Sequence, residues 1–300
     1  MNDEPSKDAL HKELQAYIRD LPVLPTLVGR LVTLDMNAEG SFDEVVEIAE
    51  EEPVFAMRIL ALANSSIFAP TQEVVSIRQA VSRVGAWRIA ELCSSIALLR
   101  VFSPKSEEER SLWRHSIQTA VAARRIAGAA KGCSAEPQDA YLLGLLHDFG
   151  RFVLAEVAPK ELQQIDEVGL IHPELLVTLE ERILGLDHSE VGALTIEHWG
   201  LPLSIAAYIR AHHVYGDVEA LRSRVKDPVL LQVVQLADYL SVQMLLAPET
   251  SPNGESPGAE EQSKWLLAVT STPPIDVATL IALTPAIREE SDALIAGLGI

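Results

Sequence analysis

Hydrophobic residues recur with a helical period along almost all of residues 6–246, whereas the alternation typical of strands is weak throughout. Proline and glycine interrupt this period and divide the chain into segments. Two starts carry capping pairs, Ser41 with Glu44 and Asp187 with Glu190. The expected helices are a first one that ends before Leu21, then 26–36, one opening at Ser41, 54–63, 77–102 with a joint at Gly85, 111–131, 137–147, 174–183, one from Asp187 to Gly200, 202–213 and 228–247.

This pattern predicts an all-α protein with two helical lobes in one domain over residues 14–246. The N-terminal lobe covers about residues 14–102 and the second lobe about 108–246, joined near 103–109. Residues 247–262 are rich in Pro, Gly, Ser and Glu, which predicts a mobile linker. Residues 263–300 then form a helical C-terminal extension. Its apolar stripe either packs back on the domain, which we favour, or mediates self-association.

Composition narrows the class of protein further. The 300 residues carry a formal net charge of −19, which disfavours a general nucleic-acid-binding role, although a local basic cleft could still bind a small phosphorylated ligand. Cys93 and Cys133 form neither a disulfide framework nor a zinc pattern. The N-terminus has no apolar secretory segment, and the apolar stretch 228–247 contains Asp238, which would be costly inside a membrane. We therefore expect a cytoplasmic protein without membrane contact.

Imidazoles and carboxylates stand out on segments that are otherwise apolar. Both are ligands of borderline and hard divalent metals. A buried imidazole or carboxylate must be satisfied by some partner, so these residues bind either a metal ion or each other. They are His115, His147, Asp148, His188, His212, His213 and Asp238.

Most of these residues also have an ordinary structural explanation, and Asp238 is the least easily explained in that way. His115 lies on an inward helix face, where a lone histidine is more often part of the core. His188 follows a helix start, where an exposed ring is the commoner case. One of His212 and His213 could stabilise a helix C-terminus. Adjacent helical residues point about 100° apart, so His147 and Asp148 can share an ion only near a helix end or bend, or with help from other helices.

The order of these residues resembles that of the metal site in the HD phosphohydrolase superfamily, and further motifs resemble the HDOD family, the HD-related output domain. The resemblance covers roughly residues 14–240. The motifs are LPVLP at 21–25, LALANS at 60–65, SIRQAV at 76–81 with Gly85, LWRHS at 112–116, GLLHDFG at 144–150, GLDHSEVG at 185–192 and WGLP at 199–202.

The resemblance implies an all-helical bacterial signalling module that acts through protein partners, with a second lobe like an HD domain. Its relatives, the HD-GYP phosphodiesterases, hydrolyse cyclic diguanylate at a site with two or three metals. By motif position, one divalent ion (Fe, Mn, Mg, Zn or Ni) would be held by His115, His147, Asp148 and Asp238. A second would be held by His188, His212 and His213, with Asp148 bridging.

In an enzyme of this kind, Asp148 and Arg151 would be catalytic. Arg151 stands where those phosphodiesterases use a lysine to hold phosphate, and an arginine can do so bidentately. The alternative, a charge on a helix surface, is the interpretation that we favour for Arg151.

The chain departs from the phosphodiesterase pattern in two places. Residues 214–217 read VYGD, without a Gly-Tyr-Pro loop, and Ser111 stands where a carboxylate is expected one turn before His115. We therefore favour a non-catalytic output or interaction domain, with homo-oligomer formation as an open alternative. The second hypothesis is a metal-dependent phosphohydrolase or cyclic-dinucleotide phosphodiesterase.

Overall fold

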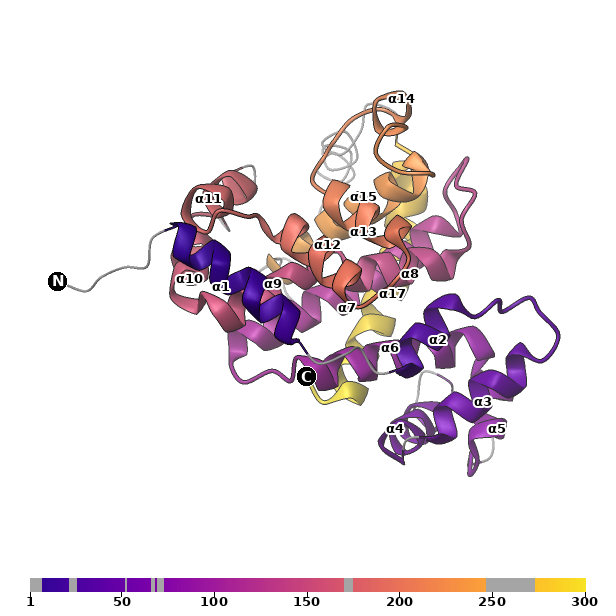
Figure 1. Cartoon of the computed structure of the whole chain (residues 1–300). Coiled ribbons are helices and arrows are strands. Elements are labelled where there is room, and N and C mark those ends of the chain that lie inside the picture. The colour runs from indigo at the N-terminus through magenta and orange to yellow at the C-terminus, as the bar shows by residue number, and fades with distance from the viewer. Residues whose placement is uncertain are drawn as a thin grey trace, which may run out of the picture.

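The protein is built from α-helices, as its sequence pattern predicts. A computed structural model describes residues 7–21, 26–51, 53–65, 68, 73–169, 175–246 and 273–300, and these contain no strand. One continuous hydrophobic core runs through the helices. Figure 1 shows a group of N-terminal helices on one side and a larger group of later helices on the other, with α6 and α7 between them.

The helices of the N-terminal group pack mainly on one another. Gly85 separates the last two of them with a φ of 97°, a conformation that favours glycine, so the predicted joint is confirmed. These helices are α2 (Thr26–Thr33), α3 (Ser41–Glu51), α4 (Pro53–Ala63), α5 (Ile77–Val84) and α6 (Ala86–Val101).

The larger group is centred on α7 (Glu107–Ala127), which packs against α8 and α15. A second set of contacts joins α12 to α9 and α13. The other members are α8 (Pro137–Leu146), α9 (Phe149–Val157), α10 (Pro159–Gly169), α11 (Leu176–Ile183), α12 (His188–His198), α13 (Leu203–Ala211), α14 (Val218–Leu221) and α15 (Pro228–Leu246).

Two terminal helices cross between regions of the sequence. α1 (Lys7–Asp20) packs on α9 and α12, and α17 (Val277–Leu298) packs on α7 and α4. The expected helical extension is therefore present and docked on its own chain. The predicted linker, residues 247–262, lies outside the described residues. The lobe boundaries stay predictions.

The predicted helix 111–131 is wrong at both ends. α7 begins four residues earlier because the Ser106 side chain caps it, accepting the backbone N–H of Glu109, and glutamates fill its first turn. It ends at Ala127, with Gly128 as its C-cap. Beyond the helix, the Lys131 N–H donates to the carbonyl of Pro274 at 2.7 Å, a contact that a local pattern does not reveal.

An aromatic cluster supports the helices that carry the polar residues. The ring of Phe149 on α9 lies 5.0 Å from that of Phe102 and 5.1 Å from that of Trp199 at the end of α12. The ring of Trp113 on α7 packs against that of Phe152, with centroids 4.7 Å apart and planes tilted by 43°, and its indole N–H donates to the carbonyl of Phe102. These rings hold α7, α9 and α12 at fixed distances from one another.

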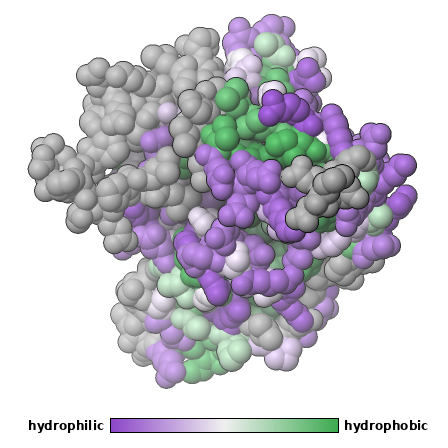
Figure 2. Space-filling model, turned by 90° about the vertical axis from the view of Figure 1, so that its left-hand side faces the viewer, coloured by the Kyte–Doolittle hydropathy of each residue, from purple (hydrophilic) through white to green (hydrophobic). Residues whose placement is uncertain are grey.

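One face of the protein is largely hydrophilic, in keeping with the acidic composition. Figure 2 shows hydrophilic residues over most of the described part of this face, with hydrophobic residues gathered in its upper half and again near its lower edge. Among the residues that the structure describes, no helix has both the length and the apolar character needed to cross a bilayer.

Candidate metal centre

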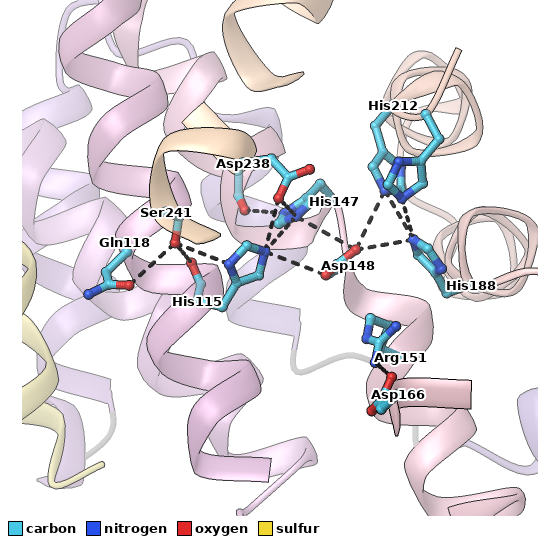
Figure 3. A network of polar contacts seen from close by, with 12 residues as sticks. His115, Gln118, His147, Asp148, Arg151, Asp166, His188, His212, Asp238 and Ser241 are labelled. Atoms are coloured by element: carbon cyan, nitrogen blue, oxygen red, sulfur yellow. Dashed lines mark hydrogen bonds and ion pairs between the residues drawn. The ribbon is translucent and has the colours of Figure 1, made fainter. Parts of the chain in front are cut away.

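The seven polar residues singled out in the sequence come together in one place, although they belong to distant segments. Figure 3 labels all of them except His213. They form two neighbouring clusters. Within each cluster, one ligand atom from every residue lies within 4.8 Å of the others. The first cluster is His115, His147 and Asp238, and the second is Asp148, His188, His212 and His213.

The His147–Asp148 pair lies at the junction of two helices. His147 is the C-cap of α8 and Asp148 the N-cap of α9, with a φ of −96° and a ψ of 16° at Asp148. This break in the helix turns both side chains toward the same centre. The condition that the sequence set for the pair, a helix end or bend, is therefore met.

Two glycines beside this pair let the neighbouring backbones approach. A Cβ added to Gly144 would lie 2.9 Å from Cα of Ala120 on α7. One added to Gly150 would lie only 1.9 Å from the carbonyl oxygen of His188 on α12. Real side chains never come so close to a backbone. The two glycines thus allow α8 and α9 to bring the pair within reach of His115 and His188.

In the first cluster, the Nε2 atoms of two histidines face one carboxylate. Oδ1 of Asp238 lies 3.2 Å from Nε2 of His115 and 3.6 Å from Nε2 of His147. The two Nε2 atoms are 3.2 Å apart. The cluster combines α7, the end of α8 and α15.

In the second cluster, Oδ1 of Asp148 lies 3.2 Å from Nε2 of His188 and 3.5 Å from Nε2 of His212. Nε2 of His188 also lies 2.8 Å from Nε2 of His213. The other carboxylate oxygen of Asp148, Oδ2, lies 3.5 Å from Nε2 of His115 in the first cluster. Asp148 therefore touches both clusters and is placed to bridge them.

In three of these histidines, the other ring nitrogen, Nδ1, forms a hydrogen bond with the protein. Nδ1 of His147 contacts the carbonyl of Gly144 at 2.8 Å, and Nδ1 of His212 contacts that of Ile209 at 2.5 Å. Nδ1 of His115 contacts the hydroxyl of Ser241 at 3.1 Å. A carbonyl accepts only from a protonated Nδ1, so the Nε2 atoms of His147 and His212 are left to face the centre, as in histidines that ligate metals.

The charges of the site also favour a bound cation. Burial raises the pKa of Asp148, but His147 and His188 lower it by a larger amount. The pKa of Asp148 is therefore well below its ordinary value. Burial lowers the pKa of His147, and Asp148 and Asp238 then raise it to about 9. The pKa values of His212 and His213 are lowered by burial and, for His213, by His212 next to it. The clustered carboxylates thus require positive charge at the centre, from protons or from metal ions.

The donor set fits a divalent metal. Imidazole and carboxylate suit Zn, Fe, Mn and Ni. Two nitrogens that each bind one ion at about 2.0–2.1 Å lie roughly 3 Å apart. The Nε2 separations of 2.8 Å and 3.2 Å match this spacing.

Comparisons with known proteins identify the family. The family model of the HDOD domain matches residues 21–215. The chain belongs to the HDOD domain family. A protein of Treponema pallidum (strain Nichols) is 29% identical over 199 residues, which span 65% of this chain and 38% of that protein. The chain thus covers less than two thirds of this relative.

Two solved structures share the fold of this chain, and one of them is an HDOD domain protein. An HDOD domain protein from Geobacter sulfurreducens has a TM-score of 0.72 and 26% identity, over 95% of this chain and 96% of its own. A Shewanella amazonensis protein provisionally described as a phosphohydrolase has a TM-score of 0.71 and 21% identity, over 96% and 99%. Both alignments extend past the matched HDOD region, into α17.

One sequence interpretation of this HDOD site is wrong. Arg151 is not a surface charge, because its side chain is 7% exposed and pairs with Asp166 at 2.5 Å and with Glu180 at 3.3 Å. For His188 the sequence left two orientations open, and the structure shows the ring fully buried. Glu180 of α11 contacts both residues, and Asp166 of α10 contacts Arg151.

Glu180 and Ser241 are part of the site although the sequence analysis did not select them. Glu180 contacts Nδ1 of His188, and Ser241 contacts Nδ1 of His115. Each carried a signal. Glu180 stands four residues from both Leu176 and Leu184, on a face that is otherwise apolar, and Ser241 follows Asp238 by one helical turn.

Proposed function

We propose that this HDOD domain binds two divalent metal ions at the centre bridged by Asp148, and that it acts as a non-catalytic signalling output module. The observation that carries the metal site is the convergence of histidine Nε2 atoms on two carboxylates, while protein acceptors occupy the Nδ1 side. One ion would be held by His115, His147, Asp148 and Asp238. The second would be held by His188, His212 and His213, with Asp148 shared.

The metal would supply Lewis acidity and could lower the pKa of a bound water. The surrounding residues argue against a hydrolase, however. Arg151, the group expected to hold a phosphate, is committed to two carboxylates, and Figure 3 shows its side chain directed toward Asp166. Residues 214–217 offer no Gly-Tyr-Pro loop in its place.

One observation favours the alternative, a metal-dependent phosphohydrolase or cyclic-dinucleotide phosphodiesterase. The side chains of Asp148 and Asp238 are 14% and 15% exposed, so solvent reaches one edge of the centre. An accessible edge is what a substrate or a small phosphorylated ligand would need. We keep this as the second candidate.

Output in this proposal comes from protein partners in a signalling pathway. The net charge of −19 supports partners with basic surfaces and opposes nucleic acid. Homo-oligomer formation remains a further proposal.

Metal binding is tested by elemental analysis and calorimetric titration of the purified protein with Mn²⁺, Fe²⁺, Zn²⁺ and Ni²⁺. We expect two ions per chain in the wild type and the loss of both in Asp148→Asn. His198→Ala is the control, because His198 is exposed and lies away from the centre. A wild type that takes up no ion from any of these metals would contradict the proposal.

Catalysis is tested separately on the metal-loaded protein, with cyclic diguanylate and an aryl phosphate as substrates. The proposal expects no turnover above the metal-free control. Turnover that disappears in Asp148→Asn would replace it with the phosphohydrolase alternative.

A further inference from the structure

A buried carboxylate lies directly behind the second cluster. Glu180 of α11 has no exposed side-chain surface, although burying a carboxylate is costly unless partners compensate. Its Oε2 accepts hydrogen bonds from Nδ1 of His188 at 2.5 Å and from the backbone N–H of His188 at 2.9 Å. Its Oε1 lies 3.3 Å from Nη1 of Arg151. Glu180 is thus engaged by a histidine of the metal centre and by an arginine.

The position of His188 in its helix explains why it needs this partner. His147 and His212 are the C-caps of their helices, where a carbonyl of the last turn can accept from Nδ1. His188 opens α12, so no carbonyl of its own helix precedes it. Glu180 takes that place, and it also satisfies the backbone N–H that the helix start leaves free.

Arg151 holds this carboxylate in place. Its guanidinium lies between Glu180 on α11 and Asp166 on α10, and Asp148 is the N-cap of its own helix α9. Burial lowers the pKa of Arg151, but Asp166 and Glu180 raise it above the ordinary value. The guanidinium therefore stays charged and compensates Glu180. The unit Asp166–Arg151–Glu180 connects two outer helices to one metal-facing histidine.

The acceptors behind the histidines differ in charge. Ser241 gives His115 a neutral hydroxyl, and backbone carbonyls serve His147 and His212. Among the contacts described for these four rings, Glu180 is the anionic acceptor. A carboxylate behind Nδ1 raises the donor strength of the opposite nitrogen and fixes the ring orientation.

We propose that Glu180 is a positioning residue of the metal centre. It makes Nε2 of His188 a stronger donor than the Nε2 atoms of the first cluster, so that the second cluster binds its ion more tightly. This inference rests on the metal binding proposed above.

The test is a titration of Glu180→Gln with Co²⁺, followed by calorimetry and visible absorption. Glutamine keeps the size of the side chain and one neutral acceptor. We expect the second-cluster ion to bind about 10–100-fold more weakly, with a shifted Co²⁺ spectrum, while first-cluster affinity changes less than about threefold. His115→Ala and His213→Ala assign the two binding steps. Ser241→Ala is the matched variant and should weaken the first cluster instead.

The outcomes separate the two proposals. A wild type that binds no ion contradicts the proposed function. A wild type that binds two ions, with both affinities and the spectrum unchanged in Glu180→Gln, overturns this inference alone. If Glu180→Gln does not fold, Asp166→Asn replaces it, because that side chain is 31% exposed. Asp166→Asn loosens Arg151 and should weaken the second cluster in the same direction by a smaller factor, and an unchanged affinity there also overturns the inference.

Discussion

Single residues set the distances between the helices at the metal centre. Glycine is needed where a larger side chain would collide with the backbone of a neighbouring helix. Gly144 and Gly150 stand on either side of His147 and Asp148. Each faces the backbone of another helix at a distance that a Cβ would violate. The centre therefore depends on residues that donate nothing to it.

Gly150→Ala should destabilise the fold and loosen the centre. The new Cβ would lie 1.9 Å from the carbonyl oxygen of His188, so α9 or α12 must move. Overpacking of this kind costs about 1–3 kcal/mol or more in the free energy of unfolding. Chemical denaturation measures this loss, and titration measures the accompanying weaker metal binding.

Gly128→Ala provides the control for this change. A Cβ there meets its nearest neighbours at 3.7 Å, an ordinary contact, and the φ of Gly128 is −64°. We expect no loss, and a gain of up to about 1 kcal/mol from the stiffer unfolded chain. Equal destabilisation by the two variants would contradict the role given to Gly150.

Residue patterns also show how much of the site was predictable. All seven ligand candidates could be named because an imidazole or carboxylate on an apolar stripe is visible in the sequence. The acceptors Glu180 and Ser241 could not, because each lies on a different helix from its histidine, 8 and 126 residues away in the chain. Whether the seven bind metal stays a prediction.

At the scale of helices, two acidic residues join elements that are distant in sequence. Asp227 precedes α15, accepts hydrogen bonds from the N–H groups of Val229 and Leu230, and accepts the hydroxyl and N–H of Ser134 ahead of α8. Burial raises the pKa of Asp227, but these hydrogen bonds lower it below the ordinary value. The ionised carboxylate is therefore the form that the fold stabilises.

Asp227→Asn should lower stability in a pH-dependent manner. A carboxylate with a lowered folded pKa contributes stability above its unfolded pKa near 3.8, and that contribution is lost as the pH falls through the folded value. We expect a deficit of about 0.5–2 kcal/mol at pH 7 that shrinks below pH 4. Denaturation series from pH 3 to 7 measure it. The exposed cap Asp217 of the short helix α14 gives the control, and Asp217→Asn should change little. A deficit that does not depend on pH would argue against the ionised form.

The docking of α17 depends on Glu290, which is 5% exposed. Its carboxylate pairs with Arg88 on α6 and with Arg124 and Arg125 on α7, the latter two at 2.7 Å. Removing one partner of a buried charge cluster leaves the others uncompensated. The C-terminal extension is thus attached by charge as well as by its apolar stripe.

Glu290→Gln should therefore destabilise the protein by about 3–5 kcal/mol and expose α17 to protease. Glu289→Gln, one residue earlier and exposed to solvent, is the matched control and should have little effect. Limited proteolysis followed by mass spectrometry locates the first cut. A first cut outside α17 in Glu290→Gln would show that this pairing does not hold the helix.

At the scale of the whole molecule, the centre joins helices that are spread over residues 107–246 of the chain. Its ligands come from α7, the junction of α8 and α9, α12, α13 and α15. Helix α1 supports α9 and α12 from the other end of the sequence. An ion at this centre would therefore connect elements that the unfolded chain holds far apart.

Metal should raise the unfolding temperature of the intact protein. A ligand that binds the folded state alone stabilises it by about 2.7 kcal/mol at a free concentration 100-fold above Kd. Differential scanning calorimetry with added metal, and again after EDTA, measures the rise and its reversal. An equal rise in Asp148→Asn would instead indicate binding to the acidic surface.

The sequence by itself determined the helical class, most boundaries of the helices that it predicted, the joint at Gly85 and the polar residues of the centre. These follow from local periodicity, capping residues and apolar stripes, which act over a few residues. The sequence did not predict α9, α10 or α14. Only the tertiary structure decided the burial of Arg151 and His188, the acceptors behind His115 and His188, and the placement of α1 and α17. Those features depend on which helices become neighbours, because hydrogen bonds and ion pairs between distant segments leave no periodic trace in the chain.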